Sequence, residues 1–332
     1  MRLPTWLRQH LAALRMLLVL TVIVGIGYPL AITAVAQLPG LKDKANGSLV
    51  KAANGEVIGS TLIGQPFTGK DGNPLPQYFQ SRPSAAGDGY DPTATGASNL
   101  GPESIVDTLP DPSIKDDEGK QSLLTQVCAR SKAVGELEGV DGSRPFCTAS
   151  GVGAVLAVFG TRTGDGHVTR VVSVNEACPS AAGAGSGPSV PGAGSGPSPA
   201  GAGSGTAAAG AGSRTAVPFI ATYQGVPVEC AKFGEDYAAG VLVPVRGDAP
   251  AHPAVPADAV TAGGSGLDPG ISPAYARLQA PRVAKARGID VGQVLALVSA
   301  HTTGRTLGFV GEPWVNVLQL ILTLDRQYPF RS

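Results

Sequence analysis

The strongest constraint on this chain is an uncharged run near its N-terminus, from Met16 to Ala36. A helix of about 20 apolar residues matches the hydrocarbon thickness of a bilayer. Three arginines precede the run without an acidic residue among them, and the charges that follow it nearly cancel. An excess of basic residues favours the cytoplasmic side of a span. We therefore expect a single-pass protein of the cell membrane, with a cytoplasmic tail over 1–15, a transmembrane helix over 16–37 and an extracytoplasmic remainder.

A cleaved signal peptide is the alternative explanation of this run, because Ala34-Val35-Ala36 has the small-x-small form of a cleavage site. The apolar core of a signal peptide usually spans about 7–15 residues, and this run is longer. Pro29 lies in its outer half, where a membrane span tolerates a kink. These features favour an uncleaved anchor.

The rest of the chain is neutral and contains one segment of very low complexity. With 25 basic and 25 acidic residues, the chain has no net charge that would recruit nucleic acid. Residues 179–213 are almost wholly Ala, Gly, Ser and Pro, a composition typical of a flexible linker. This linker interrupts a chain that is otherwise long enough for one moderate domain with an insertion.

The cysteines indicate disulfides rather than a metal site. Their even number in an oxidising compartment allows three connectivities, and none belongs to a Cys-x-x-Cys pair. The four are Cys128, Cys147, Cys178 and Cys230. If they are oxidised, Cys128 and Cys147 are the favoured pair, because they bracket one compact block of intermediate length. Isolated buried thiols are the alternative.

Apolar periodicity and turn signals predict a mixture of strands and helices after the span. Asn54-Gly55, between two apolar segments, predicts a hairpin over 47–64 with a type I′ turn. Ser272-Pro273 is typical of a helix start, and Pro281 should kink that helix or split it in two. Further expected elements are a helix over 122–134, an apolar run over 152–159, a strand over 167–174 and a helix over 291–301. For 314–324 three alternatives remain: a strand, a helix, or a strand followed by a helix. The mixture indicates an α+β domain.

Two segments resemble anion-binding motifs without meeting their chemistry. Gly64 to Asp71 nearly spells a phosphate-binding loop, but Asp71 replaces the hydroxyl that would hold Mg²⁺, and Pro74 follows too soon for a helix. The helix that bears Arg282, Lys285 and Arg287 could attract an anion, although such a stripe is more often a solvated face. An anchored enzyme is disfavoured, because no nucleophile elbow, metal cluster or pair of catalytic acids stands out.

The segment Thr261 to Ser272 is the best candidate for a contact surface. Its glycines let the backbone approach a partner closely, and it leads directly into a helix N-terminus. A contact loop and an ordinary turn that feeds a helix explain this pattern equally well.

At these residues the chain resembles the C subunit of the Kdp-type potassium-transporting P-type ATPase. The resemblance rests on short fragments that occur in the family's order on both sides of the central region. They are Tyr28-Pro29-Leu30, Asn46-Gly47-Ser48-Leu49, Leu62 to Phe67, Tyr78-Phe79, Arg82-Pro83-Ser84-Ala85, Ser98 to Pro102, Val260-Thr261-Ala262, Ser265 to Pro269, Ile271-Ser272, Leu278 to Arg287, Leu307-Gly308-Phe309, Gly311-Glu312-Pro313 and Val315 to Leu318. Gly263 and Ile321 depart from the family's usual Ser and Asn.

The resemblance implies one N-terminal transmembrane helix followed by an extracytoplasmic α+β domain with a large, partly disordered insertion. The domain would comprise 38–110 and 251–332, and the insertion 111–250 would replace a short helical connection. The resemblance gives this insertion no role.

By the same resemblance, the protein is a non-catalytic subunit of a high-affinity, ATP-driven potassium uptake complex. Its partners would be a channel-like subunit that conducts K⁺, a P-type subunit that hydrolyses ATP, and the lipid bilayer. The family is described as a catalytic chaperone that raises the ATP affinity of the hydrolysing subunit. A membrane-anchored extracytoplasmic binding protein for another transporter is the alternative.

The resemblance also implies a nucleotide-linked or partner-contact loop, with a nearby glutamine proposed to contact nucleotide. The corresponding residues are Thr261, Gly264, Ser265, Gly266, Leu267, Asp268 and Gln279. ATP is thus a ligand by resemblance only, and no tightly bound cofactor is expected. Because the expected topology separates this loop from cytoplasmic ATP, we expect any effect on ATP affinity to act through coupled conformations.

Overall fold

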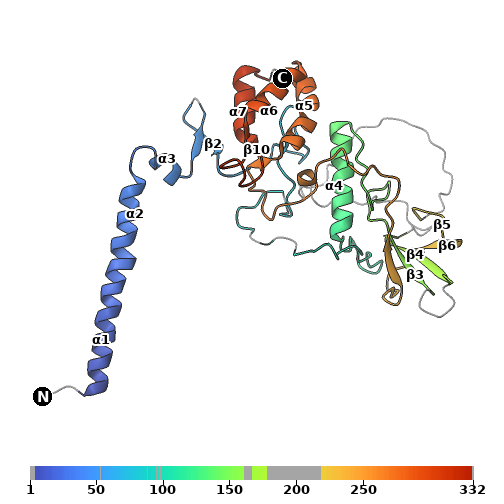
Figure 1. The fold of residues 1–332 in the computed structure, drawn as a ribbon, viewed down its shortest axis with the longest axis horizontal. Helices are drawn as coiled ribbons and strands as arrows, with labels where there is room; N and C mark the ends of the chain where they lie inside the picture. The colour runs from blue at the N-terminus through green and yellow to red at the C-terminus, as the bar shows by residue number, and fades with distance from the viewer. Residues whose placement is uncertain are drawn as a thin grey trace. The chain divides into compact units, whose positions relative to one another are not determined.

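A computed structural model describes residues 4–52, 54–87, 89–94, 96, 99–160, 167–177 and 218–330 (Figure 1). The expected linker, 179–213, lies outside the described residues. The chain divides into two compact units, 1–63 and 64–332, which we describe separately.

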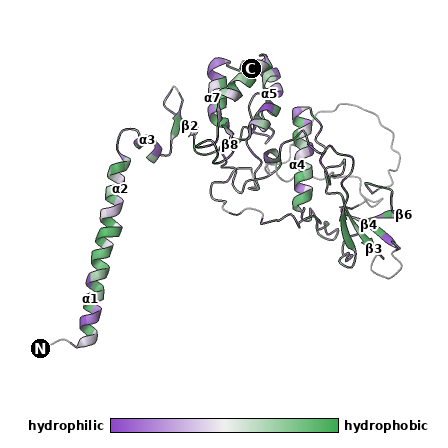
Figure 2. Ribbon diagram, in the orientation of Figure 1, coloured by the Kyte–Doolittle hydropathy of each residue, from purple (hydrophilic) through white to green (hydrophobic). Residues whose placement is uncertain are grey.

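The first unit begins with one long apolar helix. It runs from Thr5 to Ala36 as α1 (Thr5–Leu20), the π-helical turn η1 (Thr21–Gly27) and α2 (Tyr28–Ala36). Figure 2 shows hydrophobic residues along most of its length. Its 32 residues span about 48 Å, more than the hydrocarbon core of a bilayer requires. The helix therefore begins within the segment 1–15 and is long enough and apolar enough to cross a membrane.

The π-helical turn lies directly before Pro29, which has no N–H to donate to the preceding turn. The backbone N–H of Tyr28 instead bonds to Ile23 O, five residues back. A wider turn of this kind accommodates a proline without ending the helix. At Pro29, where a kink was expected, the helix thus continues after a wider, π-helical turn.

A short helix and a hairpin complete the first unit. They are α3 (Lys42–Ala45), β1 (Leu49–Lys51) and β2 (Val57–Ser60), and the two strands are antiparallel. The hairpin prediction is confirmed, but the type I′ turn is wrong. Gly55 has a positive φ of 85°, and its N–H bonds to Ala52 O, so the turn begins one residue earlier than a two-residue loop at Asn54-Gly55 requires. The irregular register at Val50/Lys51 fits this longer turn better than a two-residue loop.

Three helices and a small sheet form the larger core of the second unit. α5 (Pro273–Arg287), α6 (Val291–Ala300) and α7 (Val317–Gln327) pack together (Figure 1), against a sheet of order β8 (Gly270–Ile271), β10 (Trp314–Asn316) and β9 (Thr302–Thr303). A single 3₁₀ turn, η2 (Ala257–Ala259), precedes them. The fully buried side chains of Phe79, Val283 and Leu320 belong to this core.

The sequence predicts these helix starts well. Ser272 Oγ accepts the N–H of Tyr275, so α5 begins at the expected cap, and Gly288 ends it in the left-handed conformation. Pro281 lies inside α5 without splitting it, so that alternative is wrong. The carbonyl that Pro281 leaves without a helical donor belongs to Arg277, which is exposed to solvent. The segment 314–324 is a strand followed by a helix.

A second sheet occupies the middle of the chain. Its order is β5 (Thr222–Tyr223), β6 (Val226–Ala231), β4 (Arg170–Ala177), β3 (Val155–Phe159) and β7 (Val241–Pro244). Only β4 and β6 are parallel; the other pairs are antiparallel. Leu156, Val158 and Val171 form a core on one face, whereas Val155 and Ala157 face the other.

The helix α4 (Leu123–Glu138) joins the two cores. Leu124 packs against Val155 and Ala157 of the sheet, whereas Val127 and Val134 pack against the helical core. Ser122 caps α4 by accepting the N–H of Thr125. This confirms the helix expected over 122–134, which extends further, to Glu138. The central region is therefore packed into the second unit through this helix rather than attached as a separate body.

Candidate functional site

The glycine-rich loop 261–268 lies along a segment that is distant in sequence. Gly263 N–H bonds to Pro83 O at 2.9 Å, and Ala85 N–H bonds to Gly263 O at 2.8 Å, so the two segments pair in parallel. Further along, Asp91 N–H bonds to Ser265 O at 2.9 Å. The segment 82–91 therefore holds the loop in one shape, through backbone groups that any sequence would carry.

Glycine is required at two points of this pairing. Gly266 has φ 76°, a left-handed conformation, and a Cβ added there would overlap the carbonyl oxygen of Gly89. A Cβ on Gly64 would likewise overlap the carbonyl oxygen of Asp268, while Gly64 N–H bonds to Leu267 O at 2.9 Å. The backbones thus approach closely, as the glycines predict, but the partner they approach is this chain itself.

Arg82 fixes both ends of the loop. Its Nη1 lies 3.1 Å from Asp268 Oδ2, and its Nη2 donates to Thr261 O at 3.1 Å. Asp268 is about half exposed, so the ion pair itself adds at most modest stability. Its effect is geometric, because one guanidinium group bridges the first and last residues of the loop.

Gln279 is fully buried on α5, and its amide is engaged by the chain. Its Oε1 accepts the N–H of Gln80 at 2.6 Å, and its Nε2 donates to Gln80 O at 3.0 Å. Arg282 Nη2 donates to the same Oε1 at 3.0 Å. The side-chain amide therefore bonds both backbone groups of Gln80, as a neighbouring β-strand would, and holds the chain at Gln80 against α5. We call this pair of hydrogen bonds the structural clamp.

Arg282 extends this clamp to α4. Its Nε donates to both carboxylate oxygens of Glu138, at 3.1 and 3.0 Å, and its Nη1 donates to Pro76 O and Tyr78 O. The Glu138 side chain has no exposed surface. Burial raises the pKa of Glu138, and the hydrogen bonds and charge of Arg282 oppose this rise. Removing either partner would leave the other charge buried without compensation.

The expectation of a solvated basic stripe on α5 is wrong for two of its three residues. Arg282 is 9% exposed, and Arg287 has no exposed side-chain surface. Arg287 donates to Gln77 O and Tyr328 O and forms an ion pair with Asp325. Both arginines therefore hold chain segments against α5, and neither is free to attract an anion.

A cleft of about 510 Å³ opens beside the loop. Its lining includes Gly266 and Arg82, the α5 residue Tyr275, and Arg130 from α4. Arg130 is 6% exposed and donates to Val260 O and to Gln126 Oε1. Burial lowers the pKa of the Arg130 guanidinium and raises that of the Tyr275 hydroxyl, because in each case it disfavours the charged form. The lining also includes the carboxylate of Glu136, whose side chain is 70% exposed.

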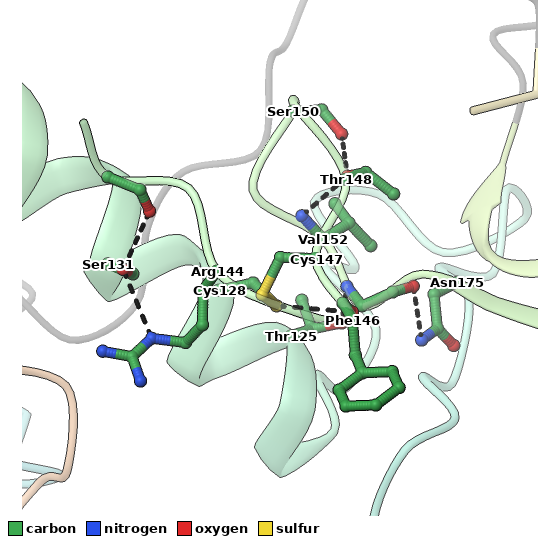
Figure 3. Close-up of a disulfide and its surroundings, with 12 residues drawn as sticks. Thr125, Cys128, Ser131, Arg144, Phe146, Cys147, Thr148, Ser150, Val152 and Asn175 are labelled. Carbon is green, nitrogen blue, oxygen red and sulfur yellow. Dashed lines mark hydrogen bonds between the residues drawn. A yellow bond between two sulfur atoms is a disulfide. The ribbon is translucent and has the colours of Figure 1, made fainter. Parts of the chain in front are cut away.

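A disulfide joins α4 to the segment that follows it. Cys128 and Cys147, the pair favoured from the sequence, form it with a Cα–Cα distance of 5.5 Å (Figure 3). Nearby, Ser131 Oγ donates to Gly142 O and accepts from Arg144 Nε, so the chain after α4 folds back along it. Cys230 is also disulfide-bonded, and Cys178 lies outside the described residues.

The segment that resembles a phosphate-binding loop lacks the helix that such a loop requires. The segment 64–71 leads into a turn in which Asp71 accepts from Asn73, and no helix follows within 72–80 to receive a phosphate. Within the described residues, no three His, Cys, Asp or Glu side chains gather closely enough to hold a metal ion.

The described residues form an α+β fold with one apolar helix of membrane-spanning length, near the N-terminus. A family model described as KdpC: K⁺-transporting ATPase, c chain, matches residues 10–108 and 239–326. The chain belongs to this family. The unmatched residues between these ranges include α4, the disulfide and most of the second sheet.

Relatives of similar length align over nearly the whole chain. The potassium-transporting ATPase KdpC subunit of Kineococcus radiotolerans is 34% identical over 323 residues, covering 97% of this chain and 96% of the relative. That of Mycobacterium tuberculosis strain H37Rv is 33% identical over 319 residues, covering 96% and 98%. That of Caulobacter sp. strain K31 is 32% identical over 309 residues, covering 93% and 89%.

Proposed function

We propose that this chain is the non-catalytic c-chain subunit of an ATP-driven potassium uptake complex. The observation that carries the proposal is the family match on both flanks of the chain, which includes the apolar helix and the paired segments 82–91 and 261–268. Its partners in the complex are a channel-like subunit that conducts K⁺ and a P-type subunit that hydrolyses ATP.

The proposed topology has one span, with residues 1–15 on the cytoplasmic side and the second unit outside. The helix Thr5–Ala36 supports one crossing, and the arginines before Met16 support this orientation. A disulfide in the second unit is consistent with an oxidising compartment. An anchored extracytoplasmic binding protein is not favoured by the family membership.

Within the complex, we assign the loop 261–268 to contact with a partner subunit rather than with nucleotide. Gln279 is fully buried, with its amide oxygen and nitrogen both bonded to Gln80, and Arg82 is already paired with Asp268. A rise in ATP affinity of the P-type subunit would then act through coupled conformations of the assembly. The loop is suited to this role because the segment 82–91 and α5 fix its shape.

Copurification tests the assignment. A tag after Ser332 should recover a multi-span subunit and a P-type ATPase together from mild detergent, and cells that lack the chain should lose growth at limiting K⁺. Recovery of the tagged protein alone, with normal K⁺ uptake in its absence, would refute the proposed function.

A reporter fusion tests the topology. A reporter that is active only outside the cytoplasm, fused after Ser332, should be active while the protein stays membrane-bound at full length. Release of a form that begins near Gln37 would mean that the apolar helix is a cleaved signal.

A further inference from the structure

The cleft beside the loop 261–268 contains a buried arginine whose charge has no counter-ion in the described part of the chain. Arg130, on α4, lines the cleft and is 6% exposed. Its guanidinium donates to Val260 O at 3.2 Å and to Gln126 Oε1 at 3.1 Å, which are both neutral oxygens. Within the described ranges it forms no ion pair, and its Nε has no hydrogen-bond partner. Because arginine keeps its proton in proteins, an unpaired positive charge lies at the wall of the cleft.

A buried charge of this kind destabilises the chain unless an opposite charge compensates it. Two other arginines of the second unit are as deeply buried, and each has its own carboxylate: Arg282 pairs with Glu138 and Arg287 with Asp325. Burial lowers the pKa of Arg130, and no neighbouring carboxylate opposes this fall. Of these three arginines, the one without a described counter-ion is therefore the one that borders a cleft.

The charges around the cleft indicate which kind of anion would fit. Besides Arg130, the charged residues of the described lining are Arg82 and Glu136. Arg82 is paired with Asp268 at 3.1 Å, and Glu136 with Lys132 at 4.0 Å. One positive charge thus remains unpaired, which matches a monoanion such as a carboxylate. A phosphate dianion fits less well, because Glu136 would repel its second charge.

The size and the apolar part of the wall indicate an organic ligand. The volume of about 510 Å³ lies within the range of about 300–1,000 Å³ that is typical of small-molecule sites. The apolar side chains of the lining are Pro66, Pro74, Ala133, Val134 and Leu137. An inorganic anion would fill only a small part of this space and would leave these side chains in contact with water.

We propose that this cleft binds a free organic monocarboxylate, whose carboxylate pairs with Arg130 and whose apolar body lies against the apolar side chains of the lining. Arginine recognises carboxylates through paired, charge-assisted hydrogen bonds. Arg130 belongs to α4, which lies between the two ranges that match the family model, whereas Pro66 and Arg82 belong to the first matched range. The proposal thus gives the central region a binding role, and it does not depend on the proposed function.

Two carboxylates that belong to proteins are the competing occupants. One is Asp88, which lies outside the described residues and precedes Gly89 of the lining in sequence. The other is an acidic side chain of another subunit. A free ligand is favoured over both, because a cleft of this volume is larger than one acidic side chain fills.

Thermal unfolding of the purified full chain tests the proposal, with hexanoate as the probe. Hexanamide has the same apolar body without the charge, and acetate has the charge without the body, so these two are the controls. We expect hexanoate to bind with a dissociation constant of about 1 mM. At ten times this concentration it should raise the unfolding midpoint by about 3–6 °C. An equal shift from either control, or no shift at about 10 mM hexanoate, would overturn the proposal.

Substitutions locate the bound carboxylate. Arg130→Met removes the charge and keeps most of the side chain's length, so it should weaken hexanoate binding by about tenfold or more. The matched control is Arg277→Met, an exposed arginine on α5 outside the lining, which should bind like the wild type. Ala133→Glu adds a carboxylate to the lining and should abolish the hexanoate shift while Arg130 is intact, which keeps the test decisive if Arg130→Met does not fold. Wild-type affinity in either of these two cleft variants contradicts the proposed site.

Two comparisons exclude the competing occupants. If Asp88 fills the cleft, Asp88→Asn will bind hexanoate and the wild type will not. If an acidic side chain of another subunit fills it, the isolated chain will bind hexanoate and the chain copurified with the other subunits will not. Either result would overturn the proposal of a free ligand. Neither result changes whether the subunits copurify, so the proposed function is tested separately.

Discussion

Replacement of Gln279 by leucine separates a structural clamp from a nucleotide contact. Leucine has nearly the same volume, so the change leaves no large cavity. It removes the acceptor for Gln80 N–H at 2.6 Å and the donor to Gln80 O at 3.0 Å. A fully buried backbone group left without a partner costs about 1–3 kcal/mol. Because Gln80 is only half-buried, we expect values near the lower end and a total loss of about 2–3 kcal/mol.

Thermal unfolding measures this loss. A unit of this size shifts by about 2–4 °C per kcal/mol, so the midpoint of Gln279→Leu should fall by about 4–12 °C. Fluorescence of Trp314 reports on the second unit if Trp6 is replaced by phenylalanine in every variant, because the chain has two tryptophans.

The matched control is Arg277→Ala on the same helix. Arg277 is exposed, and its change should alter stability by less than about 0.5 kcal/mol. The clamp is refuted if Gln279→Leu unfolds within about 1 °C of the control while the apparent KM of the complex for ATP rises. That result is what a direct nucleotide contact predicts.

Three further predictions follow from the second unit. Gly266→Val should displace the backbone at Gly89 and reduce copurification of the other subunits, and normal K⁺ uptake by a well-expressed variant would contradict a functional loop. Mass mapping without reductant should find Cys128 linked to Cys147, and replacing both by serine should destabilise the fold by about 3 kcal/mol for a separation of 19 residues. Burial lowers the pKa of His301, so its contribution to stability is present above the unfolded value of 6.5 and is lost as the pH falls through the folded pKa. His301→Gln should therefore lose less stability than the wild type between pH 7 and pH 5 in unfolding experiments, and an identical pH profile would contradict this cause.

The sequence predicts local structure best where one residue type has one physical role. The apolar run could only be a long helix or a signal, and Ser272-Pro273 set the start of α5 through a capping hydroxyl and a fixed φ. The glycines of 261–268 correctly indicated close backbone approach. The approaching segment, 82–91, could not be predicted, because its contacts use backbone atoms that carry no pattern in the sequence.

The prediction fails where burial depends on distant segments. Arg282 and Arg287 look like a solvated stripe along α5, since no periodic pattern shows that Glu138 and the carbonyls of 75–78 will cover Arg282. Gln279 likewise gives no local sign that Gln80 is its partner, 199 residues away in sequence.

The pairing of 82–91 with 261–268 has a consequence for how the chain is made. The first segment leaves the ribosome long before its partner, and at about 5–20 residues per second the delay is about 9–36 s. During this time the central region, which has its own sheet, can already begin to fold. That region would then bring the two flanks together as later residues arrive. Because the central region lies between the two flanks, it has time to fold before they pair. Until α5 emerges, the segment 64–91, which is rich in proline and glycine, lacks its partner and could be covered by a chaperone.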